Sequence, residues 1–263
     1  MPDIENNERD VELIEAHSFD EALSECMALR KQKYWSFRGQ RNRKWFAEPH
    51  SGDMTTADLA KNIRNFKARS MEFPRPDYIE DTNSKEIKEW RWLFYAQHHR
   101  LKTQLLDWTS NPLVALYFAV EEILSRPEKD ISGAVWAIHV KDPKKFKWEP
   151  DLESISPHNL DDWIMIRPPV VTHRIARQSG LFTFHPERQL QGMEPFCTGD
   201  DEKKFKKIEI VSPQNRNDLD LCKAIRKELG FMNIHHASLF PHPDGVANFI
   251  NDELPALSPP SDR

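Results

Sequence analysis

The sequence predicts a single α+β domain. Strand-like and helix-like segments follow one another irregularly, without the long strand and helix alternation of a doubly wound sheet. The 263 residues show no internal repeat, no Gly/Ser linker and no abrupt change of composition. A chain of this length can bury a sizeable core. Together these observations favour one α+β domain with short appendages at its ends.

Composition narrows the function classes. The chain is 38% apolar and 30% charged, and it contains no apolar run of about 18 residues, the length that a membrane helix needs. We expect no membrane anchor and no signal peptide. The formal net charge of −5 argues against a general role in coating nucleic acid. Three cysteines without metal-ligand spacing favour a cytoplasmic location and no bound metal: Cys26, Cys197 and Cys222.

The first part of the chain is expected to hold three helices and a strand after a flexible start over residues 1–18. Ser18 precedes a segment of helical spacing with acidic residues in its first turn, as at a helix N-terminus. Ile87, Trp90 and Leu93 share one face of another such segment. The expected elements are helices over 19–30, 57–66 and 84–97, an aromatic strand over 34–40, and a Pro-rich loop over 73–79.

Residues 97–119 place polar, aromatic and titratable groups inside a core-like stretch. We interpret this stretch as a buried strand, a polar turn and a helix that begins at Pro112 and is capped by Ser110 or Asn111. A strand end and a helix N-terminus together offer free backbone N–H donors, which suit an anionic ligand.

The remaining elements are expected to be mostly strands. They are a strand over 133–140, a surface excursion over 142–162, strands over 163–166, 181–184 and 205–211, a helix over 217–230, a turn with a short helix within 237–250, and a disordered tail over 251–263.

Three polar clusters can carry chemistry, since the common nucleotide-binding, metalloprotease and esterase motifs are absent. The first is Phe37-Arg38-Gly39-Gln40. An arginine at the end of an aromatic strand, followed by a glycine turn, suits a phosphate or carboxylate ligand. The alternative is an internal pair in which Arg38 holds a carboxylate such as Asp107.

The second cluster surrounds Asp107. Neighbouring histidines point in different directions, so His98 and His99 are not expected to bind one metal ion together. A buried Asp107 needs a partner, either Arg38 or backbone amides. Trp108 is expected to pack in the core, with stacking on a base or nicotinamide ring as the alternative.

The third cluster is the polar approach to the strand over 181–184. Gln178 can present its amide to a ligand at the mouth of this strand. It can equally satisfy the backbone of the turn at Gly180, and both interpretations stay open.

The ordered motifs resemble the FRG domain family, named for the Phe-Arg-Gly motif that stands here at residues 37–39. The resemblance continues through segments within 97–119, 178–183 and 238–245, and it implies an FRG domain over 19–250. Family members read Gln-His-Tyr-Gly-Leu-Pro-Thr-Arg before Leu-Leu-Asp-Trp-Thr. This chain departs from that pattern at His99, Arg100, Lys102 and Gln104, which replace Tyr, Gly, Pro and Arg.

A more distant similarity is to ADP-ribosyltransferases of the arginine-serine-glutamate type, and it rests on residues 37–39 and on 106–110 with the following helix. It implies a mixed, split β-sheet flanked by helices, NAD as co-substrate without a metal, and a protein or nucleic-acid acceptor. Gln178 lies where such enzymes carry a glutamate. The residues implied for catalysis are Arg38, Asp107, Thr109 and Gln178. Those implied for NAD binding are Arg38, Gly39, His98, Trp108, Thr109 and Ser110.

Three functions are therefore open. The first is an NAD-consuming, ADP-ribosyltransferase-like enzyme that acts as a toxin or defence effector. The second is a non-catalytic module that binds a nucleotide or phosphorylated ligand. The third is a protein–protein interaction domain whose polar motifs form buried networks. An open cleft with a carboxylate near Arg38 and Thr109 favours the enzyme, whereas a closed and fully paired network favours the third.

Overall fold

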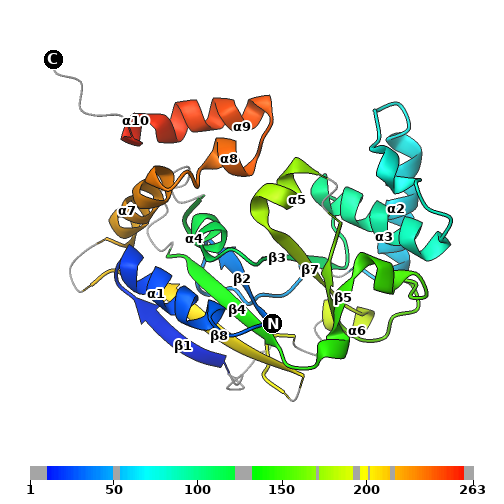
Figure 1. Cartoon of the computed structure of the whole chain (residues 1–263), viewed down its shortest axis with the longest axis horizontal. Coiled ribbons are helices and arrows are strands. Elements are labelled where there is room, and N and C mark those ends of the chain that lie inside the picture. The colour runs from blue at the N-terminus through cyan, green and yellow to red at the C-terminus, as the bar shows by residue number, and fades with distance from the viewer. Residues whose placement is uncertain are drawn as a thin grey trace.

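The computed structural model describes residues 11–49, 54–121, 132–169, 172–191, 196–200, 202–213 and 217–257 (Figure 1). In this part of the chain, helices pack around one mixed β-sheet, which confirms the predicted α+β class. None of the helices described combines the length and the apolar character that crossing a bilayer requires.

The described strands and helices are distributed along the whole chain. The strands are β1 (Val11–Ala16), β2 (Trp35–Gln40), β3 (Leu105–Thr109), β4 (Ala134–Val140), β5 (Phe146–Trp148), β6 (Ile164–Arg167), β7 (Gly180–Phe184) and β8 (Lys203–Ile210). The α-helices are α1 (Phe19–Arg30), α2 (Thr56–Arg69), α3 (Lys85–His98), α4 (Pro112–Val120), α5 (His173–Gln178), α6 (Glu187–Leu190), α7 (Asp218–Phe231), α8 (His236–Leu239), α9 (Pro243–Asn248) and α10 (Leu254–Leu257). Short 3-10 turns η1 (Asp77–Ile79), η3 (Pro143–Lys145) and η4 (Glu149–Leu152) and a π-helical turn η5 (Phe249–Glu253) connect them.

The sheet is split between β2 and β3. Its strand order is β1-β8-β4-β2-β3-β7-β6-β5, with parallel pairs at the two edges and antiparallel pairs between them. β2 pairs with β4 along its full length from Trp35 to Gln40, but it meets β3 at one registered position, Phe37 opposite Thr109. The two half-sheets therefore diverge next to the Phe-Arg-Gly motif.

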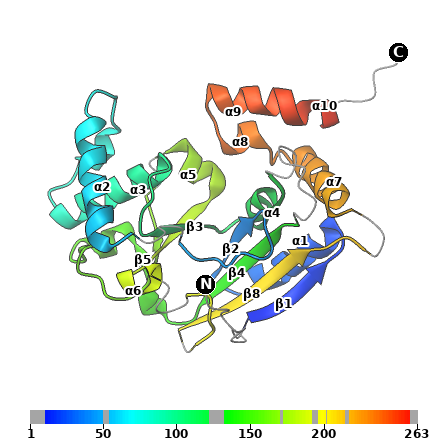
Figure 2. The same ribbon diagram turned by 180° about the vertical axis from the view of Figure 1, so that it is seen from behind.

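Each half-sheet has its own helical cover. α1, α4 and α7 pack on the half that contains β1, β2, β4 and β8 (Figures 1 and 2). α3 packs on β3, β6 and β7 through Trp90, Phe94 and Phe184. α4 is apolar around almost its whole circumference, and Asn111 caps it by accepting from the Leu113 N–H at 3.0 Å. The predicted helix start is thus confirmed, with Asn111 rather than Ser110 as the cap.

The structure adds local detail to the expectations at five places. The start over 1–18, expected to be flexible, contains β1, which pairs with β8 and is joined to it by an ion pair between Glu12 Oε1 and Lys206 Nζ at 2.6 Å. The surface excursion over 142–162 contains the strand β5. This strand was not predicted, because three residues give too short a pattern to recognise. The loop over 73–79 ends in η1, and the polar approach to β7 is the helix α5. The tail over 251–263 begins with the end of η5 and α10, while residues 258–263 lie outside the described part.

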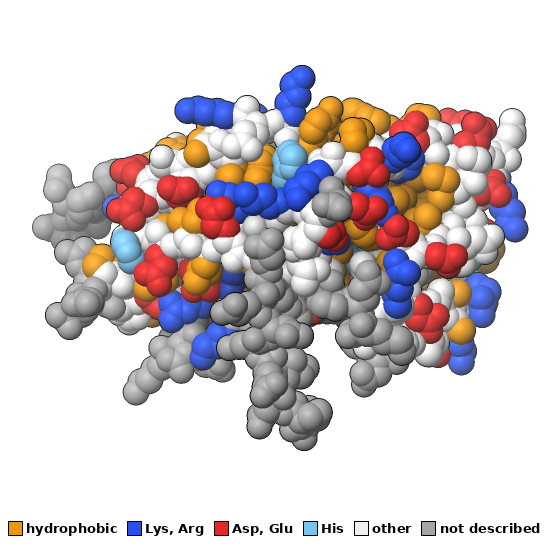
Figure 3. Space-filling model, turned by 90° about the horizontal axis from the view of Figure 1, so that it is seen from below, with side chains coloured by type: hydrophobic (Ala, Val, Ile, Leu, Met, Phe, Trp, Pro, Cys, Tyr) orange, Lys and Arg blue, Asp and Glu red, His pale blue; other side chains and the backbone are white. Residues whose placement is uncertain are grey.

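Charged side chains of both signs are mixed on the face drawn in Figure 3. Ion pairs on β1 and β8 place the two signs next to each other, as in Lys206 with Glu12 at 2.6 Å and Lys207 with Glu209 at 2.7 Å.

Candidate ligand pocket at the split of the sheet

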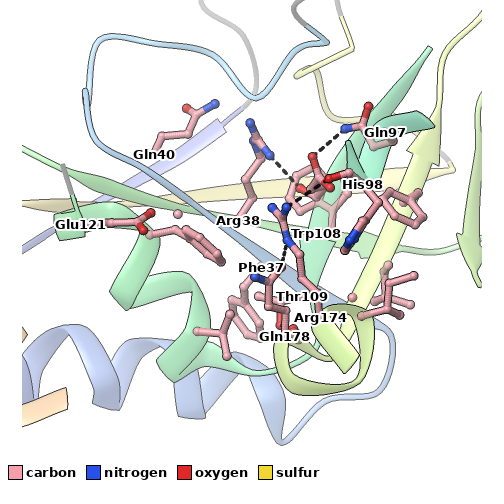
Figure 4. A pocket seen from close by; sticks show the side chains of 18 of the residues that line it. Phe37, Arg38, Gln40, Gln97, His98, Trp108, Thr109, Glu121, Arg174 and Gln178 are labelled. Atoms are coloured by element: carbon pink, nitrogen blue, oxygen red, sulfur yellow. Dashed lines mark hydrogen bonds between the residues drawn. The ribbon is translucent and has the colours of Figure 1, made fainter. Parts of the chain in front are cut away.

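A pocket of about 310 Å³ opens where the two half-sheets diverge (Figure 4). Its walls come from β2, β3 and β7 and from the helices α3, α4 and α5. Seven of the residues expected to form a site line it: Arg38, Gly39, His98, Asp107, Trp108, Thr109 and Gln178. The fold thus brings together side chains that lie up to 140 positions apart in the sequence, although their roles stay predictions.

Gly39 sets how closely α4 approaches β2. A Cβ atom at this position would lie 1.9 Å from the Ala115 carbonyl oxygen and 2.5 Å from the Ala119 nitrogen. Both atoms belong to the backbone of α4, so a side chain here would push the helix away from the strand. The glycine of the motif is therefore a packing requirement, in addition to being part of the pocket wall.

Arg38 points from β2 into this pocket (Figure 4). Its Nη1 donates to the backbone carbonyl of Asp107 at 2.9 Å, and its buried Nε has no hydrogen-bond partner among the described residues. Burial lowers the pKa of the guanidinium below its ordinary value, and the Asp107 carboxylate opposes this shift. An arginine with buried, unsatisfied donors next to a cavity is suited to an anionic ligand.

Arg174 supplies a second guanidinium from α5, which the sequence argument did not single out. Its Nε donates to Gln178 Oε1 at 3.4 Å, and its Nη1 donates to the His98 carbonyl at 3.3 Å. Burial lowers the pKa of Arg174, while Asp107 and Glu121 act in the opposite direction. The four-residue spacing between Arg174 and Gln178 on a helix was the sequence signal that could have found it.

Asp107 has a different partner from the two that were expected. Its Oδ2 accepts from Gln97 Nε2 at 2.7 Å, and Gln97 Oε1 in turn accepts from Thr103 Oγ1 at 2.7 Å. Arg38 is bonded to the Asp107 main chain rather than to its carboxylate. The Asp107 side chain points out of β3 and is exposed, whereas the neighbouring residues on the strand are buried. The carboxylate therefore faces the pocket in a defined orientation.

Glu121 adds a second carboxylate, directly after α4. Val114, Phe118 and Glu121 follow one another at helical spacing, and all three line the pocket. Glu121 Oε1 accepts from Tyr117 Oη at 3.5 Å and lies 3.3 Å from His236 Nδ1. This spacing could have identified Glu121 from the sequence, whereas its contact with His236 could not have been predicted.

Several expected ligand-binding groups are already used within the protein. Thr109 Oγ1 donates to the Gln178 carbonyl at 2.6 Å and accepts from the Asn111 N–H at 3.0 Å. The Gln178 amide donates to the Leu239 carbonyl at 3.2 Å, so it holds α8 rather than the turn at Gly180. The Trp108 indole donates to Thr183 Oγ1 at 2.9 Å within a buried cluster, as its core interpretation predicts.

Ser110 does not line this pocket, and its expected role in NAD binding stays a prediction. Ser110 lines a different cavity, next to Arg167 and Pro168, and its hydroxyl donates to the Ser179 carbonyl at 3.5 Å. Ser110 follows the last residue of β3, in the short connection between this strand and α4.

His98 lies between the pocket and a second cavity. Burial, together with the charge of Arg174, lowers its pKa to about 4. The imidazole is therefore neutral near pH 7 and acts there as a hydrogen-bonding ring without charge. Within the described chain, no group of three His, Cys, Asp or Glu side chains is arranged to hold a metal ion.

Comparison with known proteins identifies one family. The model of the FRG domain matches residues 33–128, which contain β2, α2, α3, β3 and α4. Arg38, Gly39, Asp107 and Glu121 fall inside this match, whereas Arg174 and Gln178 follow it. Neither the curated proteins nor the solved structures include one that matches the chain.

Proposed function

The chain carries an FRG domain over residues 33–128, and we propose that the pocket of this domain binds NAD and transfers its ADP-ribose group to an acceptor. Arg38 and Arg174 would bind the pyrophosphate, and Asp107 and Glu121 would face the reacting ribose. We also propose that the domain extends over residues 19–250, because β7 and α5, which follow the matched residues, complete the pocket wall.

The observation that carries the proposal is the pairing of two half-buried guanidinium groups with two carboxylates around one cavity. A buried donor without a partner is unfavourable by about 1–3 kcal/mol, and the Arg38 Nε is such a donor. A diphosphate placed in the pocket would satisfy this donor and neutralise both arginines. NAD, like other nucleoside diphosphates, combines this charge with an aromatic ring that suits the apolar wall of Phe37, Phe118 and Leu181.

The reaction requires a carboxylate near the anomeric carbon. The bond between nicotinamide nitrogen and ribose C1′ breaks, nicotinamide leaves with the electron pair, and the acceptor nucleophile forms the new bond at C1′ and loses its proton. Positive charge develops at C1′ and the ring oxygen in the transition state, where a nearby carboxylate stabilises it. Asp107 and Glu121, which both line the pocket, are the candidates, and Glu121 would also accept the proton of the nucleophile.

Incubation with NAD labelled in its adenylate part tests this proposal. We expect label transfer or nicotinamide release by the wild type and about a hundredfold loss in Arg38→Ala. Arg64→Ala is the matched control, because Arg64 is exposed on α2 and lines neither this pocket nor the second cavity beside His98. The absence of both label transfer and nicotinamide release from the wild type, with acceptor mixtures present, would rule out the enzymatic function.

One observation favours a second candidate, a non-catalytic nucleotide-binding module. The Thr109 hydroxyl and the Gln178 amide are both engaged in internal hydrogen bonds, so two of the expected catalytic groups are not free. ADP-ribose at about a hundred times its dissociation constant would stabilise a binding protein by about 2.7 kcal/mol. Such stabilisation, dependent on Arg38 but without NAD turnover, would establish this second function.

A further inference from the structure

A second cavity of about 680 Å³ adjoins the pocket and shares His98 and Arg174 with it. Its walls come from the segment after α3, from α5 and from the turn between α8 and α9. Two arginines and four histidines line it: Arg100, Arg174, His98, His99, His173 and His242.

Arg100 is held in an unusual backbone conformation. Its φ is 65°, in the left-handed region that favours glycine. A non-glycine residue persists there at a conformational disadvantage. The side chain is exposed and forms no ion pair within the described chain. The exposed Arg100 guanidinium therefore adds a positive charge to the lining of the cavity.

The charges of this cavity are unbalanced. Burial is the main cause that lowers the pKa of Arg174, and the positive charge of Arg100 acts in the same direction, whereas Asp107 and Glu121 oppose it. Among the described lining residues the one carboxylate is Asp244, which is almost fully exposed and lies 3.9 Å from His242. A phosphate bound in this cavity would offset the positive charge of its lining.

Aromatic rings accompany these charges. The rings of His98 and His99 have centroids 5.0 Å apart, and the Arg174 guanidinium lies 5.0 Å from the centre of the Phe240 ring. His98 is neutral near pH 7, so it offers a ring face or edge rather than another charge. Single-stranded nucleic acid is recognised by this combination of cations for phosphates and flat rings for bases.

We propose that this second cavity binds a single strand of nucleic acid through Arg100 and the surrounding histidine rings, while Arg174, which lines both cavities, stays with the pyrophosphate in the first pocket. The strand is the acceptor in the reaction proposed above, and this acceptor role rests on that proposed function. A phosphopeptide offers phosphate but no bases that could stack on the histidine rings.

Fluorescence anisotropy with a labelled single strand of about ten nucleotides tests the proposal. We expect Arg100→Ala and Arg100→Gly to weaken binding by about fivefold each and to lower the salt slope by about one. Arg100→Lys should restore most of the affinity, because it keeps the charge. Arg64→Ala removes an exposed arginine elsewhere and should bind as the wild type does. Arg100→Gly guards against misfolding, since glycine suits the backbone at this position.

Three results would overturn the inference: equal binding by wild type and Arg100→Ala, an equal loss in Arg64→Ala, or tighter Arg100-dependent binding of a phosphopeptide of the same length. The assay contains no NAD, so its outcome is independent of turnover. If Arg100-dependent binding of the strand is seen but NAD is never consumed, the proposed enzyme fails and the nucleic-acid site stands. If NAD is consumed but the strand does not bind, the enzyme stands and the acceptor is of another class.

Discussion

At the scale of single residues, one absent side chain fixes the shape of the pocket. In Gly39→Ala the new Cβ would meet the backbone of α4 at 1.9 Å, and the helix has no flexible atom there that can yield. We expect a destabilisation of about 3 kcal/mol in urea unfolding, together with weaker ADP-ribose binding. Gly180→Ala is the control in the same pocket, because its Cβ would meet Ile175 at an ordinary 3.7 Å. Equal stability of the two variants would contradict this account of the motif glycine.

Arg100 offers the opposite case, in which glycine should improve the fold. Both Arg100→Ala and Arg100→Gly remove the charge, but glycine alone removes the disadvantage of a φ of 65°. We expect Arg100→Gly to be more stable than Arg100→Ala by about 1 kcal/mol in urea unfolding. If alanine proved as stable as glycine, the backbone at this position would not be strained, and the argument that a strained residue is kept for its charge would lose its basis.

At the scale of elements, β3 and β7 are joined by a hydrogen-bonded chain of buried side chains beneath the pocket. Trp108 donates to Thr183, the Thr183 hydroxyl lies 2.8 Å from His185 Nε2, and His185 Nδ1 lies 2.9 Å from Gln189 Oε1. A neutral His185 with its proton on Nδ1 satisfies each of these contacts. Complete burial, with smaller contributions from Arg38 and Lys203, lowers its pKa to about 3.

This chain makes stability depend on pH. The unfolded His185 takes up a proton below its ordinary pKa of 6.5, whereas the folded one stays neutral down to about 3. The contribution of neutral His185 to the free energy of unfolding is therefore complete above pH 6.5. It is lost as the pH falls, by about 1.4 kcal/mol per pH unit. His98 contributes in the same direction over a narrower range. The slope of the free energy of unfolding against pH measures how many protons are taken up on unfolding. In His185→Gln we expect this slope, between about pH 4.5 and 6.5, to be smaller by the equivalent of about one proton.

Urea unfolding at several pH values measures this slope, with His158→Gln as the control because His158 is exposed. An unchanged slope in His185→Gln would mean that His185 is protonated in the folded state. The initial stability of His185→Gln does not decide the question, since the glutamine leaves part of the hydrogen-bonded chain unsatisfied.

Local patterns predicted most elements but not the ones that depend on distant partners. The cap at Ser18, the proline at the start of α4 and the apolar face of α3 are encoded within a few residues, and those helices were predicted correctly. β1 is half exposed and acidic, and its pairing with β8 is almost two hundred residues away. Local sequence cannot show such a pairing.

In the candidate site, too, local patterns predicted some residues, whereas others depend on distant contacts. Arg38 and Asp107 stand out because a charged residue inside an apolar strand demands an explanation. Arg174 and Glu121 lie on helices where polar residues are ordinary, and they become notable through the cavity that they share. The contacts that engage Thr109 and Gln178 run between β3, α5 and α8, so no local pattern could have revealed them.

At the scale of the whole molecule, the C-terminal segment is tied to the pocket by a buried ion pair. Arg226 Nη2 of α7 donates to Glu253 Oε1 at 2.7 Å, and both side chains are less than one tenth exposed. Tyr117 Oη lies within hydrogen-bond distance of Arg226, Glu253, His236 and Glu121. The turn η5 therefore holds the end of α4, from which Glu121 reaches the pocket.

Breaking this pair should destabilise the fold and loosen Glu121 together. Glu253→Gln leaves Arg226 buried without a counter-charge, which we expect to lower the free energy of unfolding by about 3–5 kcal/mol. Lys223→Ala is the control, because its pair with Asp220 is exposed and spans 3.8 Å, and it should change stability by less than about 0.5 kcal/mol. Replacing both partners, as in Arg226→Met with Glu253→Leu, should recover most of the loss, since no lone charge then remains buried. If Glu253→Gln were as mild as Lys223→Ala, the C-terminal segment would not be fastened through this pair. In that case the orientation of Glu121 would have to come from His236 and Tyr117 alone.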